Sequence, residues 1–340
     1  MRRETRDRLA AWLKETARRS FSGKAALVCL FGSHVNGTAN EHSDLDCYFV
    51  PKTGEGWALA RTFLIQGVGY DFFPLTWERL EGLARLEEPL LPLLGDARVL
   101  WFDTVGDLLR FRQLQGRLAA ALRKKDLREA AAWERAGRAW SWLPDPGCGL
   151  GESRLQAGFV LMDLAEALAL REGTYFHNGL KRQFSDLLAL RALPERFEEQ
   201  YLAVLRGETP REIGTACRAL LESCPWPDSG KRRSPARSGP PDPEALAALY
   251  EELASTFQKI YRCEESGDRV LAYLSAVCLQ RDLPWLEIVS AYRYDDLAPL
   301  ASAARQAEAE VRRAVREGGA VLREYTSFEQ FEQAEKERGC

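Results

Sequence analysis

The stretch from Leu30 to Val50 constrains the fold of this chain more than any other part of the sequence. An apolar run over residues 25–31 ends abruptly at Gly32 and Ser33, and a short polar loop leads into a second apolar run over residues 47–50. Short apolar runs bounded by glycine and polar residues are typical of buried strands. The pattern therefore predicts two core strands with a tight Gly-Ser turn after the first.

Two carboxylates stand at the entrance to the second predicted strand, at Asp44 and Asp46. Successive strand residues point to opposite faces, so these two side chains are expected to project together while Leu45 turns into the core. Paired carboxylates repel each other unless a divalent cation lies between them, and their hard oxygen atoms suit Mg²⁺. Backbone N–H groups and the hydroxyl at Gly32 and Ser33 would face an anion such as a phosphate. These residues together predict a phosphoryl or nucleotidyl transfer site.

The segment LFGSHVNGTANEHSDLDCYFV, residues 30–50, resembles the motif of the DNA polymerase β superfamily of nucleotidyltransferases. It is most similar to the minimal and kanamycin nucleotidyltransferase-like branch, and the likeness includes Gly37 and the serine at position 43. The resemblance implies that Gly32 and Ser33 bind the nucleotide and that Asp44 and Asp46 are catalytic metal ligands. A surface turn followed by an ordinary strand is the competing interpretation.

A third acid lies within the apolar run of residues 68–73, at Asp71. A carboxylate inside a buried strand is costly without a partner, so Asp71 should face a positive group, or else face water from an edge strand. In the resembling family a third metal-site carboxylate lies on the strand beside the Asp-x-Asp strand. Asp71 is the residue that fits this role.

The bulk properties describe an ordinary globular protein. The 340 residues suffice for two or three domains, 46% are hydrophobic and 29% are charged, and the net charge is −3. This balance gives no general attraction to nucleic acid or to a membrane, and no apolar run reaches membrane-spanning length. The eight cysteines form no C-x-x-C pair and only three histidines are present, so we expect no zinc site and a cytoplasmic, reduced protein.

We expect an α+β fold in which a nucleotidyltransferase α/β domain with a small mixed sheet precedes an all-α region. Helical periodicity dominates after residue 108, and a proline-rich segment interrupts it. The polar tail from Phe328 is expected to fray. The expected parts are the nucleotidyltransferase domain at 1–108, a helical, substrate-covering domain at 109–224, an exposed linker at 225–244 and a C-terminal helical region at 245–340.

Four residues of the helical region are further candidates. Asp163 and Glu166 lie in an otherwise apolar helix, where a carboxylate must face solvent, pair or serve a site. The resemblance implies a helical domain that covers the cleft and supplies a carboxylate base, so both are candidate catalytic residues. Lys181 and Arg182 follow an aromatic pair, as in small nucleotidyltransferases with a helical partner domain, and would contact substrate or triphosphate. An exposed basic first helical turn explains them equally well.

The predicted reaction transfers a nucleoside monophosphate, expected to be AMP from ATP, to a hydroxyl of a small-molecule acceptor. Asp44 and Asp46 would hold one Mg²⁺, and Asp71 would help to hold a second. If the second ion is absent, a carboxylate of the helical domain must act as base. We expect a monomer or homodimer with no membrane or nucleic-acid partner. The alternatives are an enzyme that adenylylates a protein, an antitoxin-like minimal nucleotidyltransferase, or a non-catalytic nucleotide-binding module.

Overall fold

The computed structural model describes residues 2–37, 44–236 and 238–338, and its chain forms two compact units. The first unit contains the residues up to Lys124, the segment Ala247–Ser255 and the residues from Ala320 onward; the second contains Lys125–Leu246 and Thr256–Gly319. Two segments from the last hundred residues therefore return to the N-terminal unit. This division differs from the expected boundaries at 108 and 245.

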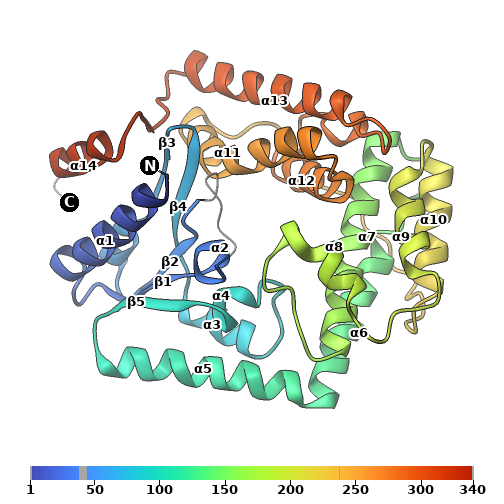
Figure 1. The fold of residues 1–340 in the computed structure, drawn as a ribbon, viewed down its shortest axis with the longest axis horizontal. Helices are drawn as coiled ribbons and strands as arrows, with labels where there is room; N and C mark the ends of the chain where they lie inside the picture. The colour runs from blue at the N-terminus through green and yellow to red at the C-terminus, as the bar shows by residue number, and fades with distance from the viewer. Residues whose placement is uncertain (1, 38–43, 237, 339–340) are drawn as a thin grey trace. The chain divides into compact units, whose positions relative to one another are not determined.

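The first unit is built on one mixed sheet (Figure 1). Its strands, in the order in which they neighbour one another, are β5 (Arg98–Phe102), β1 (Ala25–Leu30), β2 (Cys47–Pro51), β4 (Val68–Pro74), β3 (Arg61–Ile65) and β6 (Glu324–Tyr325). The pairs β2–β4 and β3–β6 are parallel, and the others are antiparallel. The predicted α+β class with a small mixed sheet is confirmed.

One face of this sheet packs against helices from both ends of the chain. The helices α1 (Arg2–Ser20) and α14 (Phe328–Glu337) lie side by side in Figure 1. Alternate strand residues, among them Val28, Phe49 and Phe72, enter a common core with Leu13 and Phe331 of these helices. The tail from Phe328 was expected to fray, and this was wrong for its described part, because its aromatic side chains complete the core.

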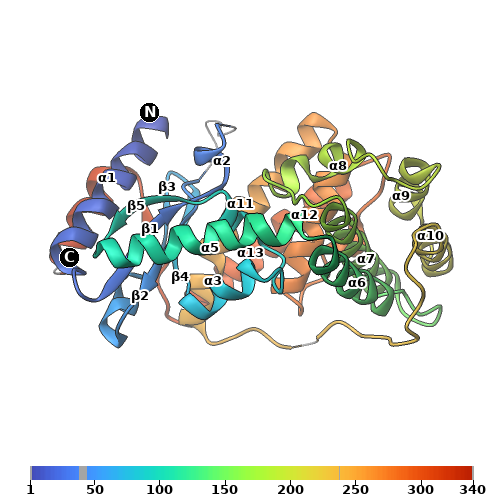
Figure 2. The same ribbon diagram turned by 90° about the horizontal axis from the view of Figure 1, so that it is seen from below.

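The other face of the sheet lies against three further helices, α3 (Trp77–Ala84), α4 (Pro92–Gly95) and α5 (Val105–Arg123). Figure 2 shows α5 running alongside β1 and β5. The hydroxyl of Tyr48 on β2 donates a hydrogen bond of 2.7 Å to the carbonyl of Leu93 in α4. Gln115 of α5 donates to the carbonyls of Leu94 and Ala97. These bonds fix the helices over the middle of the sheet.

Three short elements complete the first unit. They are the single helical turn α2 (Gly32–Val35), the 3-10 helix η1 (Gly54–Leu59) and the 247–255 segment of α11 (Pro243–Ser266). Strand β3 lies partly within a segment whose structure the sequence did not indicate. It pairs with β4 through a tight turn at Gln66 and Gly67, both with positive φ.

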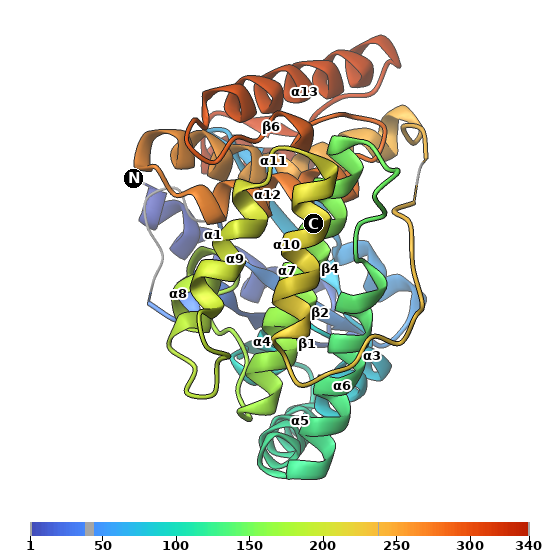
Figure 3. The same cartoon turned by 90° about the vertical axis from the view of Figure 1, so that its right-hand side faces the viewer.

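The second unit is helical, as predicted for the region after residue 108. Figure 3 shows α9 and α10 beside α7. Its helices are α6 (Lys125–Ser141), α7 (Leu150–Arg171), α8 (Leu180–Leu188), α9 (Phe197–Arg206), α10 (Pro210–Glu222), the second half of α11, α12 (Arg269–Asp282) and α13 (Ala298–Glu317), with the 3-10 helix η2 (Val289–Ala291). Gly158 permits the close packing of α7 and α12, since a Cβ there would lie 2.3 Å from a methyl group of Val277. None of the helices that the structure describes is long and apolar enough to cross a membrane.

The proline-rich segment contains no helix or strand among its described residues from 225 to 242. Its beginning is nevertheless fixed to the second unit. The indole of Trp140 donates a 2.8 Å hydrogen bond to the carbonyl of Trp226, and the amide of Arg233 donates to the carbonyl of Ser141 at 2.7 Å. Trp226 is buried. The segment is thus extended and most of its described residues are exposed, as expected, while Trp226 and the Arg233 amide attach it to α6.

Candidate active site

The turn after β1 brings a glycine against a carboxylate. Gly32 has a φ of +68°, a conformation that favours glycine, and a Cβ built there would lie 2.1 Å from Oδ2 of Asp46. The amide of Phe31 donates a 3.1 Å hydrogen bond to the carbonyl of Asp46, which ties the two chain segments together. No side chain other than glycine's hydrogen fits between the turn and this carboxylate.

Ser33 follows within the single helical turn α2. Its hydroxyl oxygen is buried and has no hydrogen-bond partner among the described residues. A buried polar group without a partner costs about 1–3 kcal/mol, so most such groups in native proteins are satisfied by some partner. The Ser33 hydroxyl therefore fits a site that an external hydrogen-bonding group completes.

Two of the predicted site carboxylates, Asp46 and Asp71, lie beside each other. Leu45 turns into the core beneath α1, and the next residue, Asp46, lies against Gly32. Strands β2 and β4 pair in parallel with Cys47 opposite Phe72, so the same register places Asp46 beside Asp71. The Asp-x-Asp pair precedes β2 instead of lying within it. Position 43 of the motif lies outside the described residues.

Burial and a second acid both raise the pKa of Asp71. Burial, and then the neighbouring carboxylate of Glu252 in α11, raise the pKa of Asp71 to about 7. The described residues contain no group of three His, Cys, Asp or Glu side chains close enough to hold a metal ion together. Adjacent carboxylates repel one another when no cation lies between them. The register places the carboxylates of Asp46 and Asp71 beside each other, and the role of Asp44, Asp46 and Asp71 as metal ligands remains a prediction.

The α11 segment reaches this face through Glu251, a buried residue that the sequence did not single out. Its carboxylate accepts a 2.9 Å hydrogen bond from the hydroxyl of Thr62 and a second bond from the amide of Arg323. Its carbonyl lies so close to Gly69 that a Cβ there would be 2.3 Å away. Thr62 is the direct strand partner of Asp71. Residues near position 250 therefore pack beside Asp71, although no local signal in the sequence marks them.

Asp163 and Glu166 lie together on α7 in the second unit, where they meet two arginines of α6. Arg138 donates hydrogen bonds of 2.6 and 3.1 Å to Asp163, and the Arg135 guanidinium lies 3.2 Å from Glu166. Burial raises the pKa of both carboxyls, that of Glu166 to about 7, and both arginines oppose this. The arrangement is an ion-pair network between two helices, and the role of either carboxylate as base remains a prediction.

Lys181 and Arg182 occupy the first turn of α8, also in the second unit. Gly179, with a φ of +56°, directs the chain into this helix. Arg182 is exposed and lies 3.6 Å from Asp186 one turn later. Arg182 is thus at the solvated side of the helix start while Lys181 is half-buried there, and contact of either residue with a triphosphate remains a prediction.

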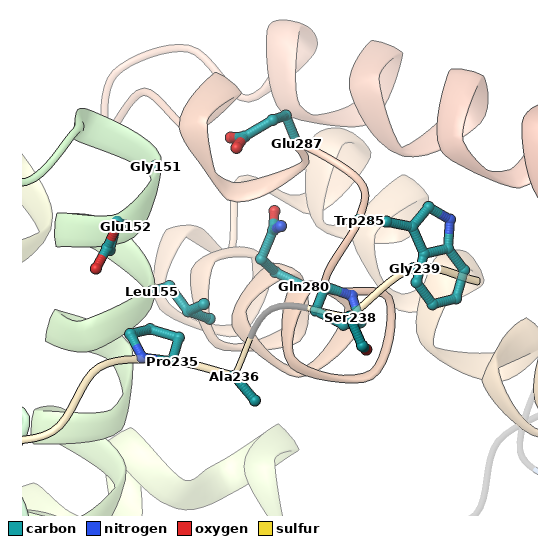
Figure 4. A pocket seen from close by; sticks show the side chains of 11 residues that line it. Gly151, Glu152, Leu155, Pro235, Ala236, Ser238, Gly239, Gln280, Trp285 and Glu287 are labelled. Carbon is teal, nitrogen blue, oxygen red and sulfur yellow. The ribbon is translucent and has the colours of Figure 1, made fainter. Parts of the chain in front are cut away.

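A cavity of about 440 Å³ lies within the second unit (Figure 4). Glu152 at the start of α7 and Trp285 and Glu287 after α12 line it, together with described residues of the proline-rich segment. None of the residues predicted to be catalytic or nucleotide-binding lines this cavity. The predicted residues around Gly32, Asp46 and Asp71 lie instead in the first unit.

Comparison with known families gives a match to part of the first unit. Residues 11–88 match the family model of the nucleotidyltransferase domain. The match includes β1 to β4 and all five of the candidate residues at positions 32, 33, 44, 46 and 71. No curated protein matches the chain. The predicted resemblance is confirmed for this part of the chain.

Proposed function

We propose, from the premise that residues 11–88 are a nucleotidyltransferase domain, that this protein transfers AMP from ATP to a hydroxyl of a small molecule, with release of pyrophosphate. A helical unit within the same chain favours a small-molecule acceptor, because the cover for the site need not come from a partner protein. An antibiotic or a biosynthetic intermediate is the expected class of acceptor.

The observation that carries the proposal is the Ser33 hydroxyl, buried beside Gly32 with no partner among the described residues. A phosphate oxygen of the nucleotide would accept its hydrogen bond, and a bond to a charged group contributes about 1.5–3 kcal/mol. Asp46, packed against Gly32, fixes the turn in the conformation that presents this hydroxyl.

The carboxylates have the chemistry of a divalent cation site. Asp44 and Asp46 would hold one Mg²⁺ and Asp71 would help to hold another, since hard carboxylate oxygens suit this ion. Bound Mg²⁺ would neutralise charge on the phosphates and lower the pKa of the acceptor hydroxyl. Asp163 or Glu166 would serve as base, and Lys181 and Arg182 would contact phosphates, if the second unit covers the site.

The cysteines support action in the cytoplasm. All seven described cysteines are free thiols, and burial raises the pKa of Cys29 and Cys47 within the core strands. Such thiols behave as small apolar side chains and suit a reducing compartment.

The test is pyrophosphate release from labelled ATP and Mg²⁺ with a panel of aminoglycosides and hydroxylated metabolites. We expect release with an acceptor in the panel, and its abolition in Asp44→Asn and Asp46→Asn. Asp7→Asn, a change at an exposed acid of α1, is the matched control and should leave release unchanged. Unaltered turnover in the Asp44 and Asp46 variants would show that the site is assigned wrongly. ATP binding without any release would instead indicate a nucleotide-binding module.

A further inference from the structure

The strand order of the sheet determines which residues of the proposed site lie at each of its two sides. From β1 the neighbouring strands are β2, β4 and β3. Gly32 and Ser33 follow β1, Asp46 precedes β2, and Asp71 lies on β4. The proposed phosphate contacts therefore lie at one side of this row and Asp71 lies nearer the other.

The 247–255 segment of α11 packs at the far side of that row. The carbonyl of Glu251 lies against Gly69, which points to the same face of β4 as Asp71 two residues later. The carboxylate of Glu251 is bonded to Thr62 on β3, directly opposite Asp71. Its bond from the amide of Arg323 fixes the same helical turn to the chain leading into β6. This turn of α11 is thus held to the sheet by three separate segments.

The next residue, Glu252, is exposed and close enough to Asp71 for the two carboxylates to interact. We propose that Glu252 is an acceptor-binding residue of the nucleotidyltransferase site, where its carboxylate accepts a hydrogen bond from the attacking hydroxyl. This inference rests on the proposed function and adds to it a residue that comes from α11, some 160 residues beyond the matched family domain.

The geometry of phosphoryl transfer favours this side of the site for the acceptor. The attacking and leaving oxygens lie roughly in line on opposite sides of the reacting phosphorus. If Ser33 binds the departing phosphates next to β1, the attacking hydroxyl must approach from the direction of β4 and β3. Glu252 is the carboxylate that α11 holds there, and a carboxylate that accepts a hydrogen bond from the hydroxyl would orient its oxygen for attack.

Two measurements on Glu252→Gln separate acceptor binding from nucleotide binding. The first is the dissociation constant of adenosine 5′-(α,β-methylene)triphosphate, which binds but cannot transfer AMP. The second is pyrophosphate release from ATP and Mg²⁺, with water as the acceptor and again with each member of the aminoglycoside and metabolite panel, kanamycin A among them. We expect unchanged analogue binding and a loss of release of about 100-fold, the size expected when a reacting group is misplaced. Glu265→Gln, at an exposed acid of the same helix, is the matched control and should alter neither quantity.

Each outcome decides the question. Release that equals the wild-type rate in Glu252→Gln, while Asp46→Asn abolishes it, overturns the inference and leaves the proposed function standing. Weaker analogue binding in parallel with the loss of release also overturns it, because Glu252 would then act on the nucleotide. A wild-type protein that binds the analogue but releases no pyrophosphate with water or with any acceptor of the panel contradicts the proposed function, and this inference with it.

Discussion

The carboxylate of Asp46 lies against the α-carbon of Gly32, and a Cβ at that position would be 2.1 Å from its Oδ2 atom. The strand that ends at residue 30 and the Asp-x-Asp segment before β2 thus meet at one point. The proposed phosphate-binding turn and the proposed metal ligand cannot move independently, so one substitution at Gly32 should disturb both.

Gly32→Ala should destabilise the protein and also abolish pyrophosphate release. The positive φ alone costs a non-glycine residue about 1–2 kcal/mol, and the new methyl group must also displace Asp46. Gly23→Ala is the matched control, since Gly23 has a φ of +76° and open space around it. Both variants should lose unfolding free energy in chemical denaturation, but only Gly32→Ala should lose activity. Equal activity in the two would mean that Asp46 tolerates displacement.

Ser33→Ala should leave stability unchanged or slightly higher, because it removes a buried hydroxyl without a hydrogen-bond partner among the described residues. Binding of the α,β-methylene analogue of ATP should weaken by about 10-fold or more, as expected for a lost bond to a charged group. Calorimetric titration measures the binding of the analogue, and thermal unfolding measures the stability of the variant. A destabilised variant with normal binding would indicate a structural role for the hydroxyl.

The central motif could be predicted because its information is local. Alternation around Leu45 and the break at Gly32 lie within about twenty residues, and the structure places Leu45 in the core and Asp46 against Gly32. Asp71 could also be singled out, since an acid inside an apolar run stands out, and the strand register places it beside Asp46. In each case the residue's immediate neighbours carry the signal.

The remaining parts of the site could not be predicted because their contacts are distant in sequence. Glu251 and Glu252 lie in an amphipathic helix, where two acids resemble a solvated face, yet the first is buried against Thr62 on β3. Strand β3 is short, and its turn at Gln66 and Gly67 lacks the usual Asn-Gly sequence. The return of residues 247–255 and 320–338 to the first unit depends on tertiary packing that no local pattern shows.

The stability conferred by Glu166 should depend on pH. Burial raises the pKa of its carboxyl to about 7, above the ordinary 4.5, so the folded state binds the proton more tightly than the unfolded state does. The stability of the wild type relative to Glu166→Gln should therefore be highest below about pH 4.5 and should fall as the pH rises through 7. Urea denaturation at a series of pH values measures this difference. A rise with pH would show that Arg135 and Arg138 outweigh burial and keep the carboxylate charged.

Phe331→Ala should destabilise the first unit strongly, because the C-terminal helix completes its core. Phe331 is fully buried, with its ring stacked on Phe63 at 4.3 Å between centroids and edge-on to Trp12 at 4.9 Å. Removal of such a side chain costs about 3–5 kcal/mol. Tryptophan fluorescence during chemical denaturation measures the loss.

Leu90→Ala is the control for this substitution, because Leu90 belongs to the same unit but is 53% exposed. It should change the unfolding free energy by about 0.5 kcal/mol or less. A chain that ends at Gly319 should lose at least as much unfolding free energy as Phe331→Ala. It also lacks β6 and the hydrogen bond that the Arg323 amide donates to the Glu251 carboxylate. Unaltered stability in both Phe331→Ala and the shortened chain would mean that α14 does not hold the sheet, and that Glu251 alone fixes α11 beside Asp71.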